Sequence, residues 1–95
     1  MPRPPCPRVV SGEPGATYFK PAGIPLRDLR ESSLAIDGFE ALRLADLEGL
    51  SHHDAAVRMG VSRATFGRIL RQARGVVARV LVHGEALRID PSGNG

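Results

Sequence analysis

A run of arginines between Ala55 and Gly84 is the residue pattern with the clearest chemical use in this sequence. The segment holds six arginines and no acidic residue. They are Arg58, Arg63, Arg68, Arg71, Arg74 and Arg79. Guanidinium groups bind phosphates and guanine edges through paired hydrogen bonds. A surface that gathers several of them therefore suits a polyanion such as double-stranded DNA.

One amphipathic helix is expected to position these arginines. Ser62 is a typical N-terminal cap, and no proline follows before His83, so the sequence predicts a helix over this range. At about 100° per residue, its apolar side chains share one arc, which we expect to be buried. That arc holds Phe66, Ile69, Leu70, Ala73, Val76, Val77 and Val80. The opposite arc holds Arg63, Ala64, Gly67, Arg68, Arg71, Arg74 and Arg79.

Two shorter helices are expected before it. Asp37 and Glu40 have the spacing of a capping box, which predicts a helix that starts at Asp37 and stops near Gly49. Ser51 opens a second short helix, which ends at Met59-Gly60. Two helices joined by a tight glycine-containing turn, the second of them basic, form a helix-turn-helix arrangement.

The first turns of the 62–83 helix are the predicted major-groove reader. Small side chains there allow a close approach to base edges, and the free amides of a helix N-terminus attract phosphate. Further along, Arg71 and Arg74 would flank the groove and orient the helix. The predicted DNA-binding residues are Ser62, Arg63, Ala64, Thr65, Arg68, Arg71 and Arg74. The alternative is a solvated cationic helix face in an ordinary helical bundle.

Residues 1–27 carry seven of the eight prolines, which predicts an extended arm, with 8–11 and 17–20 as the only candidate short strands. Within it, the aromatic and aliphatic residues of 18–26 are expected to lie over the core. Arg3 and Arg8 are candidates for contacts in an adjacent minor groove, against the alternative of a merely disordered tail.

Several other classes of protein are disfavoured. With 95 residues and 10.2 kDa, the chain suits a single small domain. The single cysteine, Cys6, offers neither an internal disulfide nor a paired-cysteine metal site, and the adjacent His52 and His53 point about 100° apart on a helix. No nucleophile elbow or phosphate-binding loop occurs, so we expect no enzyme activity, no cofactor and no metal. No signal peptide or membrane-spanning run is present, so we expect a cytoplasmic protein without membrane contact.

Two resemblances support this interpretation. The helix-turn-helix resembles the fourth conserved region of bacterial sigma factors, on residues 47–51, 54–56, 59–62, 65–66, 68–70 and 73–74. Nearly the whole chain is similar to the prokaryotic family called domain of unknown function 134, on residues 2–4, 18–26, 40–46 and 65–70. The second resemblance implies a DNA-binding protein, because members of that family are predicted to bind DNA.

The predicted fold class is therefore mainly α, a three-helix domain like the fourth sigma region. Residues 1–27 are the proline-rich N-terminal arm, 28–84 the helix-turn-helix DNA-binding domain, and 85–95 a short strand and disordered tail. The strand is expected from the alternation around Leu87 and Ile89, and it could pair with the arm.

The predicted function is DNA binding, as a transcriptional regulator. An alternative partner is RNA polymerase or another transcription protein, because residues 28–54 hold seven acids against two bases and could form a protein-docking surface. The apolar residues late in the 62–83 helix leave two oligomeric states open. They could join a homodimer, or they could close the monomer's own core.

Overall fold

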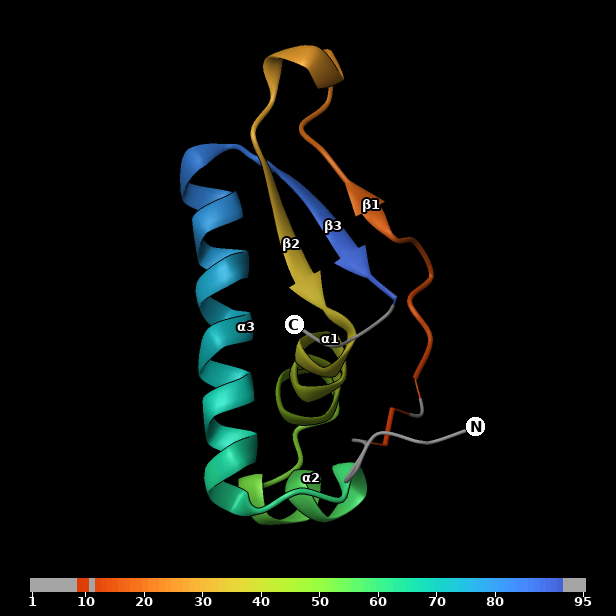
Figure 1. Ribbon diagram of the computed structural model, residues 1–95, viewed down its shortest axis with the longest axis vertical. Coiled ribbons are helices and arrows are strands. Elements are labelled where there is room, and N and C mark those ends of the chain that lie inside the picture. Colours follow the sequence, from red (N-terminus) through yellow and green to blue (C-terminus); the bar gives the residue numbers. More distant parts are fainter. Residues whose placement is uncertain (1–8, 11, 92–95) are drawn as a thin grey trace, which may run out of the picture.

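The chain folds into a three-stranded mixed sheet alongside one long helix, with two shorter helices towards one end (Figure 1). The structure, a computed structural model, describes residues 9–10 and 12–91. Its helices are the short 3-10 helix η1 (Leu26–Asp28), α1 (Ile36–Leu42), the π-helical turn η2 (Arg43–Leu47), α2 (His52–Met59) and α3 (Arg63–His83). Its strands are β1 (Tyr18–Phe19), β2 (Glu31–Ala35) and β3 (Ala86–Asp90).

The sheet has the order β1-β3-β2, with β3 in the centre. The pair β1 and β3 is antiparallel, with Phe19 opposite Leu87, whereas β2 and β3 are parallel, with Leu34 opposite Ile89. The chain between the two parallel strands contains every α-helix among the described residues. The sheet thus takes one strand from each of the segments 1–27, 28–84 and 85–95.

This sheet overturns the expected fold class: the protein is a mixed α/β structure and not a mainly α domain. The expected strand near Leu87 and Ile89 is present, and it pairs with the N-terminal segment. The strand β2 is not predicted by the sequence. Its sequence, Glu-Ser-Ser-Leu-Ala, has one large apolar residue and no alternating pattern, so it becomes a strand only because β3 pairs with it from the other end of the chain.

Two of the three predicted helix caps are confirmed and one is wrong. Ser51 and Ser62 cap α2 and α3 as predicted, each accepting a hydrogen bond from a first-turn amide. The capping box at Asp37 is wrong, because α1 begins at Ile36, directly after β2, and Ala35 occupies its N-cap without a side-chain bond. The chain enters α1 straight from a strand, so the tertiary pairing sets where this helix starts. Glu40 serves a different purpose, described below.

Two groups of buried side chains hold the elements together. Leu44, Met59, Phe66 and Leu70 lie between the helices, while Leu34, Ala73 and Ile89 lie between the sheet and α3. Gly38 sits where α1 crosses α3, and a Cβ there would lie only 3.0–3.1 Å from Leu34 and Ala73. The α3 arc predicted to be buried is confirmed in its first half, whereas Val76, Val77 and Val80 are only partly buried.

The aromatic and aliphatic segment 18–26 does not cover this core. Tyr18, Phe19, Ile24 and Leu26 are all exposed, because β1 pairs at the sheet edge and the chain then extends beyond the sheet as a loop (Figure 1). Among the described residues, no helix is both long enough and apolar enough to span a bilayer.

Candidate nucleic-acid interface

The connection between α2 and α3 builds the candidate interface from local signals. At the end of α2, Gly60 adopts a left-handed backbone with φ of 67°, where a Cβ would be strained. Val61 follows, and Ser62 then caps α3 by accepting a hydrogen bond from the Thr65 amide at 3.0 Å. Figure 1 shows α2 lying across the end of the molecule at which α3 begins. The two helices are therefore held by a turn of three residues, Gly60 to Ser62.

Most of the predicted DNA-binding residues lie on the surface of α3. Thr65 is half-buried, and the others are exposed: Ser62, Arg63, Ala64, Arg68, Arg71 and Arg74. The structure therefore places Ser62 at the cap, the next five in the first half of α3, and Arg74 just past its middle.

Three of these residues form a chain of polar contacts along the first turns. The Ser62 hydroxyl donates to Thr65 Oγ1 at 3.0 Å, and the Arg68 Nη2 group donates to the same oxygen at 3.1 Å. The hydroxyl of Thr65 thus holds the Arg68 guanidinium against the first turns of the helix. Holding a long side chain in one place reduces the entropy that it loses on binding a ligand.

Arg74 differs from the other predicted residues because it is engaged within the protein. Its Nη2 and Nε groups donate to the two carboxylate oxygens of Asp46 in η2, at 2.7 and 3.1 Å. The hydrogen bond from Arg74 lowers the pKa of the Asp46 carboxyl, and the same bond raises the pKa of Arg74. The Nε and Nη2 groups of Arg74 are thus engaged by Asp46.

Arg79, further along α3, is also engaged. Its Nε donates to both carboxylate oxygens of Glu85, at 3.1 and 3.2 Å. Glu85 is buried and accepts a further bond of 2.5 Å from the Ser32 hydroxyl, which is the main cause of its lowered pKa, ahead of Arg79. The two arginines in the second half of α3 are thus paired with acids, Asp46 in η2 and Glu85 just before β3.

Within the described part of the chain, Arg63, Arg68 and Arg71 have no acidic partner, and Arg68 donates to the neutral hydroxyl of Thr65. Arg58, in the last turn of α2 just before the turn, is also exposed and has no acidic partner there. Arg58 belongs to the arginine run of the sequence but is not among the predicted DNA-binding residues. Arg58 lies in the last turn of the predicted helix before Ser62. This position could have marked it as part of the predicted site.

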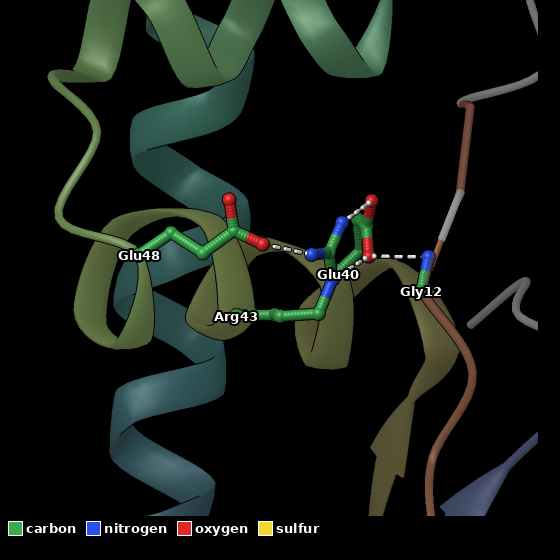
Figure 2. Close-up of polar contacts among 4 residues, drawn as sticks. All are labelled: Gly12, Glu40, Arg43 and Glu48. Carbon is green, nitrogen blue, oxygen red and sulfur yellow. Dashed lines mark hydrogen bonds and ion pairs between the residues drawn. The ribbon is translucent and has the colours of Figure 1, made fainter.

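The described part of the N-terminal segment is fixed to the helices (Figure 2). The Val9 amide donates to the Met59 carbonyl at 3.0 Å, and the Gly12 amide donates to Glu40 Oε1 at 3.2 Å. Arg43 binds both oxygens of Glu40, at 2.9 Å each, and also pairs with Glu48. Glu40 is therefore a buried anchor for the segment. Arg3, Arg8 and Cys6 lie outside the described residues.

The two adjacent histidines have no metal-binding arrangement. The ring of His52 packs edge-on against Phe66, with 5.4 Å between the ring centroids. Among the described residues, no group of three or more His, Cys, Asp or Glu side chains is arranged to hold a metal ion. The candidate site consists of exposed guanidinium and hydroxyl groups on α3.

Comparisons with known proteins agree on one family. The family model described as "Protein of unknown function DUF134" matches residues 1–94. A UPF0251 protein of Desulfosudis oleivorans is 57% identical over 90 residues, covering 95% of this chain and 65% of its own length. Similar proteins of Moorella thermoacetica and Desulforudis audaxviator, also named UPF0251 protein, are both 58% identical over 90 residues, covering 60% and 59% of their own lengths.

The chain thus spans about three fifths of the length of these relatives. No solved structure matches it.

Proposed function

This chain belongs to the DUF134 family of proteins of unknown function, and we propose that it binds double-stranded DNA through the first turns of α3 and thereby regulates transcription. The observation that carries the proposal is the division of the α3 arginines. Arg63, Arg68 and Arg71 are exposed without an acidic partner among the described residues, whereas Arg74 and Arg79 are paired with acids.

The size of the side chains between these arginines favours a groove over a flat partner. Ala64 and Gly67 lie on the same side of α3 and present almost no bulk, and the space around Gly67 is open. A helix can enter the major groove only when its leading face is narrow enough to approach the base edges. Arg68 is the candidate for a base contact, while Arg63 and Arg71 are candidates for phosphates on either side.

The α2–α3 connection supports the same orientation. In proteins that read DNA with two helices joined by a tight turn, the second helix lies in the groove and the first crosses the backbone. Here α2 would bring Arg58 towards the backbone, and the N-terminus of α3 would present its free amides to phosphate.

The test is a charge reversal with a matched control. Arg68→Glu combined with Arg71→Glu should abolish binding to a labelled duplex, measured by fluorescence anisotropy. Arg27→Glu combined with Arg30→Glu makes the same change in net charge on the loop around η1, at the opposite end of the molecule (Figure 1). This control should retain most of the affinity. Equal loss in both variants would mean that only net charge matters, and unchanged binding by the first would refute the proposal.

Salt dependence gives an independent measure. If about four to six phosphates are neutralised, the logarithm of affinity should fall against the logarithm of salt concentration with a slope near −4 to −5. Selection from fragmented genomic DNA at about 150 mM salt would then separate a specific regulator from an architectural binder. Enrichment of one short motif supports regulation, whereas retention without enrichment supports nonspecific binding.

One observation favours a second candidate function, docking on RNA polymerase or another transcription protein. Leu47 is 80% exposed and lies between Asp46 and Glu48 at the end of η2. An exposed leucine flanked by acids suits a basic protein surface with an apolar pocket. Leu47→Ser should weaken such a complex in a pull-down with purified polymerase and leave duplex binding intact. Glu40 is unsuitable for this test because it is buried, so Glu40→Lys would damage the fold first.

A further inference from the structure

The outer edge of β2 is an unpaired edge of the sheet. β2 lies at one end of the order β1-β3-β2, and in the described part of the chain no strand lies beyond it. On its inner side, the Ala86 amide donates to the Arg30 carbonyl at 2.8 Å, just before β2 begins. Backbone groups of successive strand residues point to opposite sides, so Ser32 and Leu34 also face β3, while the amide and carbonyl of Ser33 face away from it. Ser33 is exposed, which leaves these two groups available to another chain.

The two edges of the sheet differ in how they are protected. Natural sheets blunt an edge with a very short strand, a lysine or a proline, because a free edge pairs readily with other chains. The β1 edge has all three features, since β1 has two residues and is followed by Lys20 and Pro21. β2 has five residues, none of them lysine or proline. The β2 edge is therefore the one that is open to an added strand.

A cavity of about 450 Å³ lies beside this edge, between β2 and the first four turns of α3. Its β2 side is formed by residues 33–35. Its α3 side has an apolar part, made by Ile69, Ala73 and Val76. The volume falls within the range of ligand sites, about 300–1,000 Å³. A strand added to β2 would direct alternate side chains into this cavity.

The charge that the cavity offers to a ligand is that of Arg68. Asp37 and Asp90 also line the cavity, but both already interact with other groups of the protein. Arg68 has no acidic partner in the described part of the chain, and its bond to the Thr65 hydroxyl leaves the positive charge uncompensated. Guanidinium groups bind carboxylates through paired hydrogen bonds. The cavity therefore favours a ligand that carries an acidic group.

We propose that the groove between β2 and α3 binds an extended acidic peptide of a partner protein as an additional strand of the sheet. Main-chain hydrogen bonds to Ser33 hold the peptide, and side chains in the cavity select it. An apolar side chain packs on the apolar part of α3, and an acidic side chain pairs with Arg68. Arg68 precedes Ala73 by about 7.5 Å along the helix axis. Side chains on one side of a strand repeat about every 6.7 Å, so the acidic and apolar residues of the peptide are two positions apart.

A second copy of this chain is a poorer occupant of the same edge. The acidic residue of β2 is Glu31, and it is already paired with Arg88 at 3.1 Å. A β2 strand from another copy would therefore bring no free carboxylate to Arg68. The free charge of the groove thus favours a different protein as the partner.

The first experiment measures peptide binding to the full chain by fluorescence anisotropy, without DNA, so its outcome does not depend on the proposed function. The probes are hexapeptides Thr-X-Thr-Z-Thr-Thr with an N-terminal fluorescein and a C-terminal amide, in which X and Z are each set to Glu, Lys, Leu or Ser. We expect saturable binding when one position is Glu and the other Leu. Replacing that Glu with Lys, or that Leu with Ser, should weaken binding by about tenfold or more. No binding of either Glu and Leu peptide, or equal binding of the lysine peptides, overturns the site.

N-methylation of the peptide tests strand pairing on the unaltered protein. In an added strand, the amides of alternate residues point to β2. Methylating these amides should weaken binding by about tenfold, whereas methylating the amides between them should have little effect. Loss at every second position supports the proposal. Equal effects at all positions would overturn it.

Two pairs of variants locate the site on the protein. Ser33→Pro removes the outward amide of β2, a change that an edge strand tolerates because this amide has no partner in the sheet. It should weaken peptide binding by about tenfold, while Ser33→Ala, which keeps the amide, should retain it. Arg68→Gln should remove the preference for Glu over Ser in the peptide, and Arg63→Gln should preserve it. A preference for Glu that survives Arg68→Gln contradicts the assigned contact, whatever the stability of Ser33→Pro.

Sedimentation velocity then separates a peptide partner from a second copy. We expect the unaltered chain and Ser33→Pro to have the same mass in solution. A dimer that Ser33→Pro dissociates would assign the β2 edge to a second copy and would overturn the peptide site.

Discussion

The Arg74 guanidinium on α3 binds both carboxylate oxygens of Asp46, a residue 28 positions earlier in the chain. This pair ties η2 to the middle of α3 and withholds one arginine from the row that the helix otherwise exposes. Glu85 does the same for Arg79 further along. The charge available for a polyanion is thereby concentrated at the N-terminal half of α3.

Releasing Arg74 should strengthen duplex binding. Asp46→Asn removes the carboxylate, so we expect tighter binding and a salt slope steeper by about 0.9, the contribution of one additional phosphate contact. Because the pair is largely exposed, the free energy of unfolding should fall by less than about 1 kcal/mol. Asp28→Asn is the charge-matched control. The same gain in both variants would assign the effect to net charge rather than to Arg74.

Removing the buried carboxylate of Glu40 should destabilise the fold. Glu40→Ala leaves the Arg43 fork and the Gly12 amide without this acceptor, and we expect a loss of roughly 2–4 kcal/mol in the free energy of unfolding, measured with urea. Glu48→Ala removes the exposed partner of the same arginine and should cost less than about 1 kcal/mol. Similar losses in the two variants would contradict the role of Glu40 as the anchor.

Glu85 should make stability depend on pH in the acidic range. The Ser32 hydroxyl, and after it Arg79, lower the pKa of Glu85 in the folded protein below its ordinary value of 4.5. A carboxyl with a lowered folded pKa stabilises the fold above the unfolded pKa, and this contribution disappears as pH falls through the folded pKa. The stabilisation by Glu85 is thus present above about pH 4.5 and is lost below it.

Ser32→Ala removes the largest cause of that shift. The pKa of Glu85, measured by an NMR titration of its carboxyl, should rise towards its ordinary value. Acid unfolding should therefore begin at a higher pH. Ser33→Ala, in the same strand, is the control, because Ser33 has no hydrogen bond to Glu85. A Glu85 pKa unchanged by Ser32→Ala would contradict the assignment.

Substituting each of the two serine caps should distinguish an effect on thermal stability from an effect on duplex affinity. Ser51→Ala and Ser62→Ala each remove a bond to a first-turn amide, and each should cost about 1 kcal/mol in thermal unfolding. Only Ser62→Ala also breaks the contact with Thr65, which holds Arg68. We therefore expect weaker duplex binding from Ser62→Ala alone, and equal effects of both caps on affinity would argue against this positioning.

Only part of the candidate site could be predicted from the sequence. The seven predicted residues do lie along α3 from its cap to its middle, because a helix of known phase fixes which side chains share a face. That Arg74 is withheld by Asp46 could not be predicted, since nothing near Arg74 in the sequence marks a partner in η2. The cavity beside Arg68 was also missed, because its walls come from β2, α1, α3 and β3 together.

The sequence by itself determined α2, the turn at Gly60 and α3 with its end at Gly84, because a serine cap, a left-handed glycine and a run without proline act within a few residues. Only the tertiary structure decided β2 and the start of α1. Glu31–Ala35 has no strand pattern of its own and becomes a strand because β3 offers it hydrogen-bonding partners from the far end of the chain. The same long-range packing buries Glu40 and turns an expected helix cap into the anchor of the N-terminal segment.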